Sequence, residues 1–139
     1  GAQPEQLHFS HTPLGKPLCP DSGLHFSLSH SGNFVLCAVA AREVGADLEA
    51  LRTIRPALAT RVCSPAELEY VCPQGVFDSE RFLSLWTAKE AYLKYTGEGI
   101  ATDLRCIETA NAGGLFSQLR GLRLLHEKTA EYVSTVVVE

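Results

Sequence analysis

Apolar and polar positions alternate in the first third of the chain, and this alternation predicts β-strands. Residues 24–29 (LHFSLS) place every second side chain on one face, as a half-buried strand does. The turn formers at 31–33 (SGN) lead into residues 34–41 (FVLCAVAA), which predict a fully apolar strand. Residues 44–51 (VGADLEAL) predict a third strand. Residues 1–22 are rich in proline and predict an extended lead-in.

The middle of the chain changes to the period of α-helices. Residues 54–62 predict a short helix that starts near its proline. Ser64, with Pro65 at the first helical position and Glu67 three residues on, forms a capping-box pattern. This pattern predicts a second helix that runs to about Val71.

A longer helix is expected over residues 80–96. Ser79 is predicted to be its N-cap, and Gly97 and Gly99 end it. Residues 72–75 (CPQG) separate it from the preceding helix, because proline and glycine interrupt helices.

The last forty residues return to strand patterns. Strands are predicted at 104–109, 115–125 and 132–138, with a turn at 111–114 (NAGG). The expected fold class is α+β, with an antiparallel-rich sheet packed against one long helix and shorter helices. We expect one domain over residues 23–139, preceded by the lead-in of 1–22.

Composition and charge argue against some classes of protein, among them general nucleic-acid binders and membrane-spanning proteins. The chain has 139 residues, 45% hydrophobic and 20% charged, with a mean hydropathy of +0.02, as in an ordinary globular domain. Its net charge of −4 argues against a general nucleic-acid binder, although a local basic pocket for a phosphorylated small molecule remains compatible. The apolar run 34–41 is too short to span a membrane, and residues 1–7 do not have the pattern of a signal peptide.

The cysteines indicate a reducing compartment. There are five of them, an odd number, and they are scattered without a CxxC pair or the spacing of a zinc site. Reduced thiols in a cytoplasmic protein are the simplest interpretation.

Two carboxylates in the third predicted strand are candidates for metal binding. Asp47 and Glu49 point to the same face of a strand, about 7 Å apart along it. A hard divalent ion such as Mg²⁺ accepts such a pair, since it takes carboxylate oxygens and keeps water or phosphate as other ligands. The alternative is a solvent-facing strand with no ligand.

The long predicted helix carries two charges on an apolar stripe. Phe82, Trp86, Glu90 and Lys94 follow i, i+4 spacing, and the two aromatic residues are expected in the core. Glu90 could supply a third metal or acid/base carboxylate, with Lys94 directed at a phosphate. The alternative is an ordinary ion pair between Glu90 and Lys94.

Two short polar segments are candidates for anion binding. Ser29-His30-Ser31-Gly32 gathers hydroxyls, an imidazole and turn amides at the end of a strand, which suits an anion, although a polar hairpin turn would look the same. A Ser/His hydrolase is less favoured, because neither serine lies on a G-x-S-x-G elbow. The segment around Lys16 (GKP) is a turn by itself and does not match a P-loop.

These motifs in this order resemble a known family. GKP, F-x-L-SHSG, G-x-D-x-E and W-x-x-KEA-x-x-K together look like the 4′-phosphopantetheinyl transferase superfamily, specifically its Sfp-like branch with the W/KEA form. The resemblance covers roughly residues 14–100 and includes the segments SPAELEY and GEGI.

The resemblance implies an activity and a set of roles. Members transfer the phosphopantetheine arm of coenzyme A to a serine of an apo acyl or peptidyl carrier protein and release 3′,5′-ADP. By position, Asp47, Glu49 and Glu90 would hold Mg²⁺ with the coenzyme A pyrophosphate, and Glu90 or a metal-bound water would take the serine proton. Lys94 would contact the pyrophosphate. The remaining matches, in the pocket of the nucleotide phosphates, are Ser29, His30 and Lys16.

The chain also departs from the family pattern. Ser27 stands where the family usually has Asn, Ala46 where it has Ile or Val, and most of the first half typical of the family is absent. The chain is therefore either a short transferase that self-associates, which we favour, or a fragment of a longer enzyme. The expected partners are coenzyme A and the carrier protein, with no nucleic acid and no membrane.

Two other functions stay open from the residues. One is a non-catalytic carrier-protein or coenzyme A binding module that has lost its first half. The other is a Mg²⁺-dependent nuclease that uses the same carboxylates, which the acidic balance disfavours.

Overall fold

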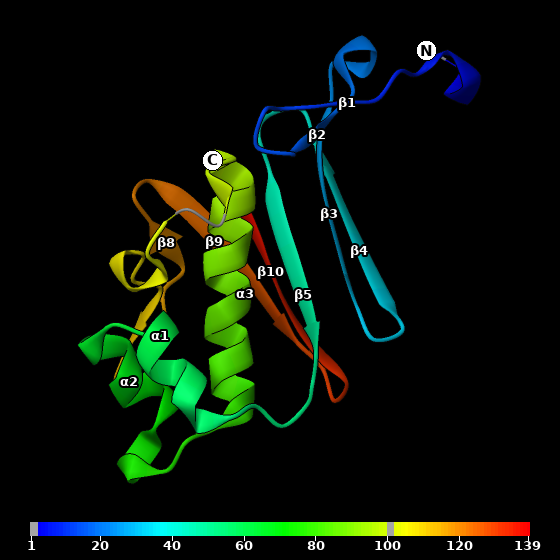
Figure 1. Ribbon diagram of the computed structural model, residues 1–139. Coiled ribbons are helices and arrows are strands. Elements are labelled where there is room, and N and C mark those ends of the chain that lie inside the picture. The colour runs from blue at the N-terminus through cyan, green and yellow to red at the C-terminus, as the bar shows by residue number, and fades with distance from the viewer. Residues whose placement is uncertain (1–2, 100–101) are drawn as a thin grey trace.

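The computed structural model describes residues 3–99 and 102–139, and its centre is one long helix lying across an antiparallel sheet (Figure 1). The sheet has the strand order β5-β10-β9-β8. Its strands are β5 (Gly45–Ala50), β8 (Gln118–Leu119), β9 (Leu122–Lys128) and β10 (Tyr132–Val138). The helix is α3 (Ser79–Thr96). The predicted α+β class, with one long helix on an antiparallel-rich sheet, is confirmed.

The remaining elements surround this centre. The short helices are α1 (Ala59–Val62) and α2 (Pro65–Val71). Two-stranded pairs are formed by β1 (Ser10–His11) with β2 (Pro17–Leu18), β3 (His25–Ser31) with β4 (Phe34–Ala40), and β6 (Ala110–Asn111) with β7 (Gly114–Leu115). Single 3₁₀ turns occur at Pro4–Gln6, Pro20–Ser22, Pro56–Leu58, Pro73–Gly75 and Leu104–Cys106. The domain boundary at residue 22 stays a prediction.

The long helix lies unusually close to β5. At Gly45, an added Cβ would lie 2.0 Å from the Ala91 carbonyl oxygen and 2.4 Å from the Tyr95 nitrogen. Side chains alternate along a strand, so Asp47 and Glu49 face the same side as Gly45, toward α3. The absence of a side chain at Gly45 thus brings the two carboxylates up to the helix.

The helix ends follow the capping signals, with one correction. The capping box of α2 is confirmed: the Ser64 N–H donates to Glu67 Oε2 at 2.9 Å, and the Glu67 N–H donates to Ser64 Oγ. The predicted N-cap Ser79 is wrong, because Asp78 Oδ1 accepts the first free N–H groups of α3. Ser79 Oγ instead accepts the Ile54 N–H at 2.9 Å. Gly97, with φ of +75°, ends α3 as predicted.

The β3–β4 hairpin lies beside the free edge of β5 (Figure 1). Serine side chains of β3 attach it there. The hydroxyls of Ser27, Ser29 and Ser31 accept N–H groups of β5 at 3.0 Å each. Every second residue of β3 therefore faces β5. The predicted strand is confirmed, but its buried positions are Ser27 and Ser29, while the apolar Leu28 is 48% exposed. The opposite face of the hairpin is open: β4 is apolar throughout, yet Val35 is 78% exposed and Val39 59% exposed.

Two strand predictions in the last third are wrong. Residues 104–109 begin with a 3₁₀ turn, because the Asp103 side chain accepts the Arg105 N–H and favours a turn there. Residues 115–125 are not one strand, since the chain reverses between β8 and β9 at Arg120 and Gly121, both with positive φ. The final predicted strand is confirmed as β10.

The core is divided along α3. Its N-terminal half packs with α1 and α2, where Phe82 is 2% exposed and Trp86 is half-buried against it. Its C-terminal half packs with Leu124 and Val137 of the sheet. Within residues 3–99 and 102–139, no helix is long and apolar enough to cross a membrane.

Candidate functional site

Asp47 is the point at which β3, β5 and α3 meet. It lies in the middle of β5 and is 6% exposed. Its Oδ1 accepts hydrogen bonds from Lys94 Nζ at 2.9 Å and from Ser29 Oγ at 3.0 Å. Lys94 Nζ also donates to the Leu28 carbonyl at 3.1 Å. Lys94 thus joins the helix to both strands, and this ion pair with Asp47 replaces the Glu90–Lys94 pair considered from the sequence.

The second oxygen of Asp47 has no hydrogen-bond partner in the described part of the chain. Asp47 Oδ2 is buried and accepts no hydrogen bond from the residues that the structure describes. Burial raises the pKa of this carboxyl, as does the nearby charge of Glu49, while Lys94 and Ser29 act in the opposite direction. A buried carboxylate oxygen without a donor is costly unless a cation or another donor reaches it. Asp47 therefore fits a divalent cation by its chemistry.

Glu90 lies one turn before Lys94 on the same side of α3, as predicted. Burial raises the pKa of its carboxyl, and the negative charges of Asp47 and Glu49 raise it further against the effect of Lys94. Glu90 and Lys94 line a cavity of about 210 Å³, together with Lys16. This cavity lies between the GKP turn, β3 and the C-terminal end of α3.

Glu49 has partners of its own. Its Oε2 accepts from Arg52 at 2.7 Å and from Ser31 Oγ at 3.2 Å. Across residues 3–99 and 102–139, no group of three or more His, Cys, Asp or Glu side chains is arranged so that it could hold a metal ion. The joint role of Asp47, Glu49 and Glu90 as metal ligands therefore stays a prediction.

The two remaining predicted anion ligands lie in different surroundings. Lys16 is only 11% exposed at its side chain, and its ammonium donates to Glu43 Oε1 at 2.5 Å and to the Tyr95 carbonyl at 3.1 Å. Lys16 thus fastens the GKP turn to the end of α3 while lining the cavity. His30 is exposed on the face of β3 opposite to Ser29, so the structure does not bring it to Asp47.

Sequence reasoning missed two contacts around the carboxylates. Arg52 lies three residues after Glu49, a spacing that could have suggested the ion pair that the structure shows. Thr135 on β10 lies directly opposite Asp47 and hydrogen-bonds Thr87 of α3 at 3.0 Å. No local signal in the sequence could have identified this second contact, because it depends on strand register.

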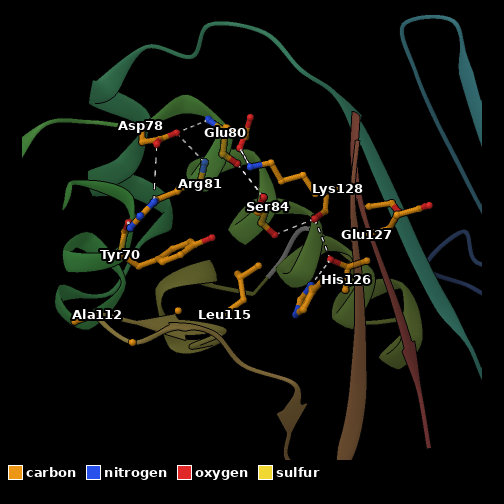
Figure 2. A pocket seen from close by; sticks show the side chains of 15 residues that line it. Tyr70, Asp78, Glu80, Arg81, Ser84, Ala112, Leu115, His126, Glu127 and Lys128 are labelled. Atoms are coloured by element: carbon orange, nitrogen blue, oxygen red, sulfur yellow. Dashed lines mark hydrogen bonds and ion pairs between the residues drawn. The ribbon is translucent and has the colours of Figure 1, made fainter. Parts of the chain in front are cut away.

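A larger cavity, of about 510 Å³, lies beside the N-terminal half of α3 (Figure 2). None of the predicted site residues lines it. Four of its charged side chains form two pairs: Lys128 contacts Glu80, and Arg81 lies 3.9 Å from Asp78. The fifth, Glu127, accepts a hydrogen bond from the Tyr132 hydroxyl at 3.2 Å. The His126 ring, also at this cavity, bonds Thr135 Oγ1 and the Phe116 carbonyl. The candidate site therefore remains the smaller cavity.

Comparisons with known proteins agree with the motifs. The sequence profile of the 4′-phosphopantetheinyl transferase superfamily matches residues 43–137. The 4′-phosphopantetheinyl transferase HetI of Nostoc sp. is 44% identical over 111 residues, covering 73% of this chain and 46% of the relative. Psf-1 of Bacillus pumilus is 39% identical over 102 residues, covering 72% and 44%, and Sfp of Bacillus subtilis is 33% identical over 100 residues, covering 70% and 45%.

The chain spans about half the length of these curated relatives. The superfamily profile covers most of the chain, including β5 with Asp47 and Glu49 and α3 with Glu90 and Lys94. The chain therefore belongs to the 4′-phosphopantetheinyl transferase superfamily.

Proposed function

We propose that this member of the superfamily takes part in the transfer of the 4′-phosphopantetheine arm of coenzyme A to a serine of an apo acyl or peptidyl carrier protein, with release of 3′,5′-ADP. The observation that supports this most is that Glu90 and Lys94 line the same cavity while Lys94 is hydrogen-bonded to Asp47. Phosphoryl transfer to a hydroxyl depends on positioning and charge neutralisation more than on a covalent intermediate, and this set of side chains suits both.

The chemistry of the carboxylates suits a Mg²⁺ ion, and binding it would require them to gather more closely than in this structure. The orphaned Asp47 Oδ2 offers a buried acceptor, and Glu49 and Glu90 would complete the protein ligands. When bound, the ion supplies charge neutralisation at the phosphate oxygens.

Glu90 is proposed to accept the proton of the carrier serine. A general base works best when its pKa approaches the working pH, and burial already shifts the pKa of Glu90 upward. Lys94 would turn from Asp47 toward the pyrophosphate and neutralise charge as the 3′,5′-ADP leaves. Lys16 lines the same cavity and supports the GKP turn.

The cavity is small for the whole co-substrate. At about 210 Å³ it lies below the range of roughly 300–1,000 Å³ typical of small-molecule sites. It would hold a part of coenzyme A about the size of its pyrophosphate. The rest of the molecule would extend beyond this cavity.

A mass-shift assay tests the proposal. An apo carrier protein is incubated with the chain, coenzyme A and Mg²⁺, and its mass should rise by one phosphopantetheine group. Glu90→Gln should reduce transfer by about 10² to 10⁴-fold, and Glu69→Gln, an exposed carboxylate change on α2, serves as the matched control. Burial of Glu90 disfavours its charged form, so a neutral glutamine of similar shape should be tolerated there and the Glu90→Gln variant should keep its fold.

The outcomes separate the candidate functions. Transfer by Glu90→Gln at the rate of the control variant would exclude Glu90 as the base. Carrier or coenzyme A binding by the unaltered chain without any mass shift would favour the non-catalytic binding module. Mg²⁺-dependent cleavage of DNA or RNA would favour the nuclease.

Self-association and a cytoplasmic location belong to the same proposal. The open apolar face of the β3–β4 hairpin is compatible with association, and light scattering measures the oligomeric state directly. The five cysteines are all free thiols in this structure, which is compatible with a reducing compartment.

A further inference from the structure

Lys89, the residue directly before Glu90, is completely buried. Its side chain is 0% exposed, and its ammonium donates three hydrogen bonds. The acceptors are the Val62 carbonyl at 2.8 Å, Glu67 Oε2 at 2.6 Å and the Leu104 carbonyl at 2.6 Å. An ammonium has three protons, so every donor is used. The three acceptors belong to α1, α2 and the 3₁₀ turn after α3.

Glu67 is equally buried and equally satisfied. Besides Lys89, its Oε2 accepts the Ser64 N–H at 2.9 Å. Its Oε1 accepts the Thr109 N–H at 2.7 Å and the Thr109 hydroxyl at 3.2 Å. Through these hydrogen bonds the pair ties α3 to α1, to α2, to the 3₁₀ turn Leu104–Cys106 and to Thr109.

Stability alone does not explain a charged pair at this place. Replacing a buried ion pair by apolar residues of similar volume is often neutral or stabilising, whereas removing one partner costs about 3–5 kcal/mol. An apolar pair, however, would not specify how α3 is rotated about its axis. Consecutive residues of a helix point about 100° apart, so a fixed Lys89 also fixes the direction of Glu90.

The contact between Lys94 of α3 and Asp47 of the sheet would not persist through the proposed reaction. Lys94 bonds Asp47 in this structure, but in the proposed reaction Lys94 turns toward the pyrophosphate. The Lys89–Glu67 pair faces away from the cavity of Glu90 and Lys94 and needs no substrate. It can hold α3 in place after Lys94 has left Asp47.

We propose that Lys89, through its buried pair with Glu67, is a positioning residue that holds Glu90 in its working orientation; this inference rests on the proposed transfer function. A displacement of about 1 Å at a reacting group can cost on the order of 10²-fold in rate. The role is therefore expected to appear in kcat more than in the binding of coenzyme A.

The test compares two double variants. Glu67→Gln/Lys89→Met removes the buried pair without leaving a lone buried charge. Glu80→Gln/Lys128→Met removes an exposed ion pair that also involves α3, with side chains 39% and 63% exposed. We expect the first to fold, to lose about 10- to 100-fold in kcat, and to keep KM for coenzyme A within about threefold. The second should keep its kcat within about twofold.

A folded Glu67→Gln/Lys89→Met variant with the kcat of the control would overturn the proposal, and so would a loss that lies wholly in KM. If this double variant does not fold, Thr109→Val decides, because it removes only the hydroxyl donor to Glu67. Thr109→Val should lower kcat about two- to fivefold at unchanged KM, and an unchanged kcat would overturn the proposal.

A readout independent of activity separates this inference from the proposed function. Trp86 is the only tryptophan, lies one turn before Glu90, and stacks on Phe82 with ring centroids 6.2 Å apart. Its emission maximum should shift in the buried double variant, or in Thr109→Val where that one decides, and stay constant in the control. If the unaltered chain transfers nothing, the proposed function fails, and an unshifted Trp86 emission would still overturn the orienting role of Lys89.

Discussion

Replacing Gly45 with alanine should separate α3 from β5 at the site itself. The added Cβ would lie 2.0 Å from the Ala91 carbonyl oxygen, 2.4 Å from the Tyr95 nitrogen and 2.8 Å from Tyr95 Cβ. Real Cβ atoms essentially never come within 3.0 Å of other heavy atoms. Two of the three neighbours are backbone atoms, which cannot rotate away as a side chain can. The helix or the strand must therefore move by about an ångström.

The cost follows from the packing. Inserting a methyl group into a filled core typically costs 1–3 kcal/mol, and rigid backbone neighbours place this substitution at the upper end, about 3 kcal/mol. In a chain of 139 residues, each kcal/mol lowers Tm by roughly 3–4 °C, so the expected loss is about 10 °C. The same movement should open the 2.9 Å contact between Lys94 and Asp47.

Urea and thermal unfolding measure this loss, with Gly113→Ala as the matched control. Among the described residues, the close neighbour of a Cβ at Gly113 is the Asn111 side-chain oxygen, at 3.1 Å, which belongs to a side chain and not to the backbone. Gly113→Ala should shift Tm by no more than about 2 °C. If Gly45→Ala unfolds at the same urea concentration and temperature as the control, α3 and β5 can accommodate a side chain at residue 45 without loss of stability, and the reasoning is refuted.

Three further predictions concern a cap, an ion pair and a thiol. Asp78→Ala should destabilise the protein by about 1 kcal/mol in urea unfolding, since the N-cap of α3 is lost. An unchanged urea midpoint would show that Asp78 does not stabilise the helix as its N-cap. Burial by itself would raise the pKa of Glu43, but the hydrogen bond and charge of Lys16 hold it below the usual 4.5. A carboxyl whose pKa is lower in the folded state stabilises the protein above pH 4.5, and this stabilisation is lost as the pH falls through the folded-state pKa. The difference in Tm between the unaltered protein and Glu43→Gln should therefore shrink below pH 4.5. A constant difference between pH 7 and pH 3 would argue against that ion pair. Burial, with the charge of Glu67, raises the pKa of the Cys63 thiol to about 12. Iodoacetamide at pH 8 should therefore alkylate the exposed Cys37 and spare Cys63 until the chain unfolds, which peptide mass spectrometry measures. Equal labelling of the two cysteines in the folded protein would contradict the burial of Cys63.

The elements with strong local signals could be predicted from the sequence. The capping box at Ser64 and Glu67 and the glycine after α3 act through their own backbone neighbours, so they need no tertiary information. The i, i+4 spacing placed Glu90 and Lys94 on one side of α3, and strand alternation placed Asp47 on a face of β5 that proved to meet them. Periodicity therefore sufficed for most of the candidate site.

The parts that could not be predicted depend on competition between partners. Asp78 and Ser79 are both good capping residues, and only the position of Ile54 shows why the serine hydroxyl is used elsewhere. Lys16 was expected to face a phosphate, but its ammonium binds Glu43 from a segment 27 residues away. The break at Arg120 needs a positive φ in a non-glycine residue, which the apolar pattern on both sides concealed.

The hydrogen bonds from β5 to Ser27, Ser29 and Ser31 of β3 do not by themselves fix the register between these two strands. These three hydrogen bonds repeat every two residues, so sliding the hairpin by two positions would still satisfy two of them. A contact outside the repeat removes this ambiguity: the ring of Phe34, in the first position of β4, lies 5.0 Å from the ring of Tyr132 on β10. In this alignment Ser29 donates to the Asp47 carboxylate, and Lys94 reaches both that carboxylate and the Leu28 carbonyl. An aromatic contact at the end of the hairpin thus helps to select the alignment in which β3 meets the charged residues of the candidate site.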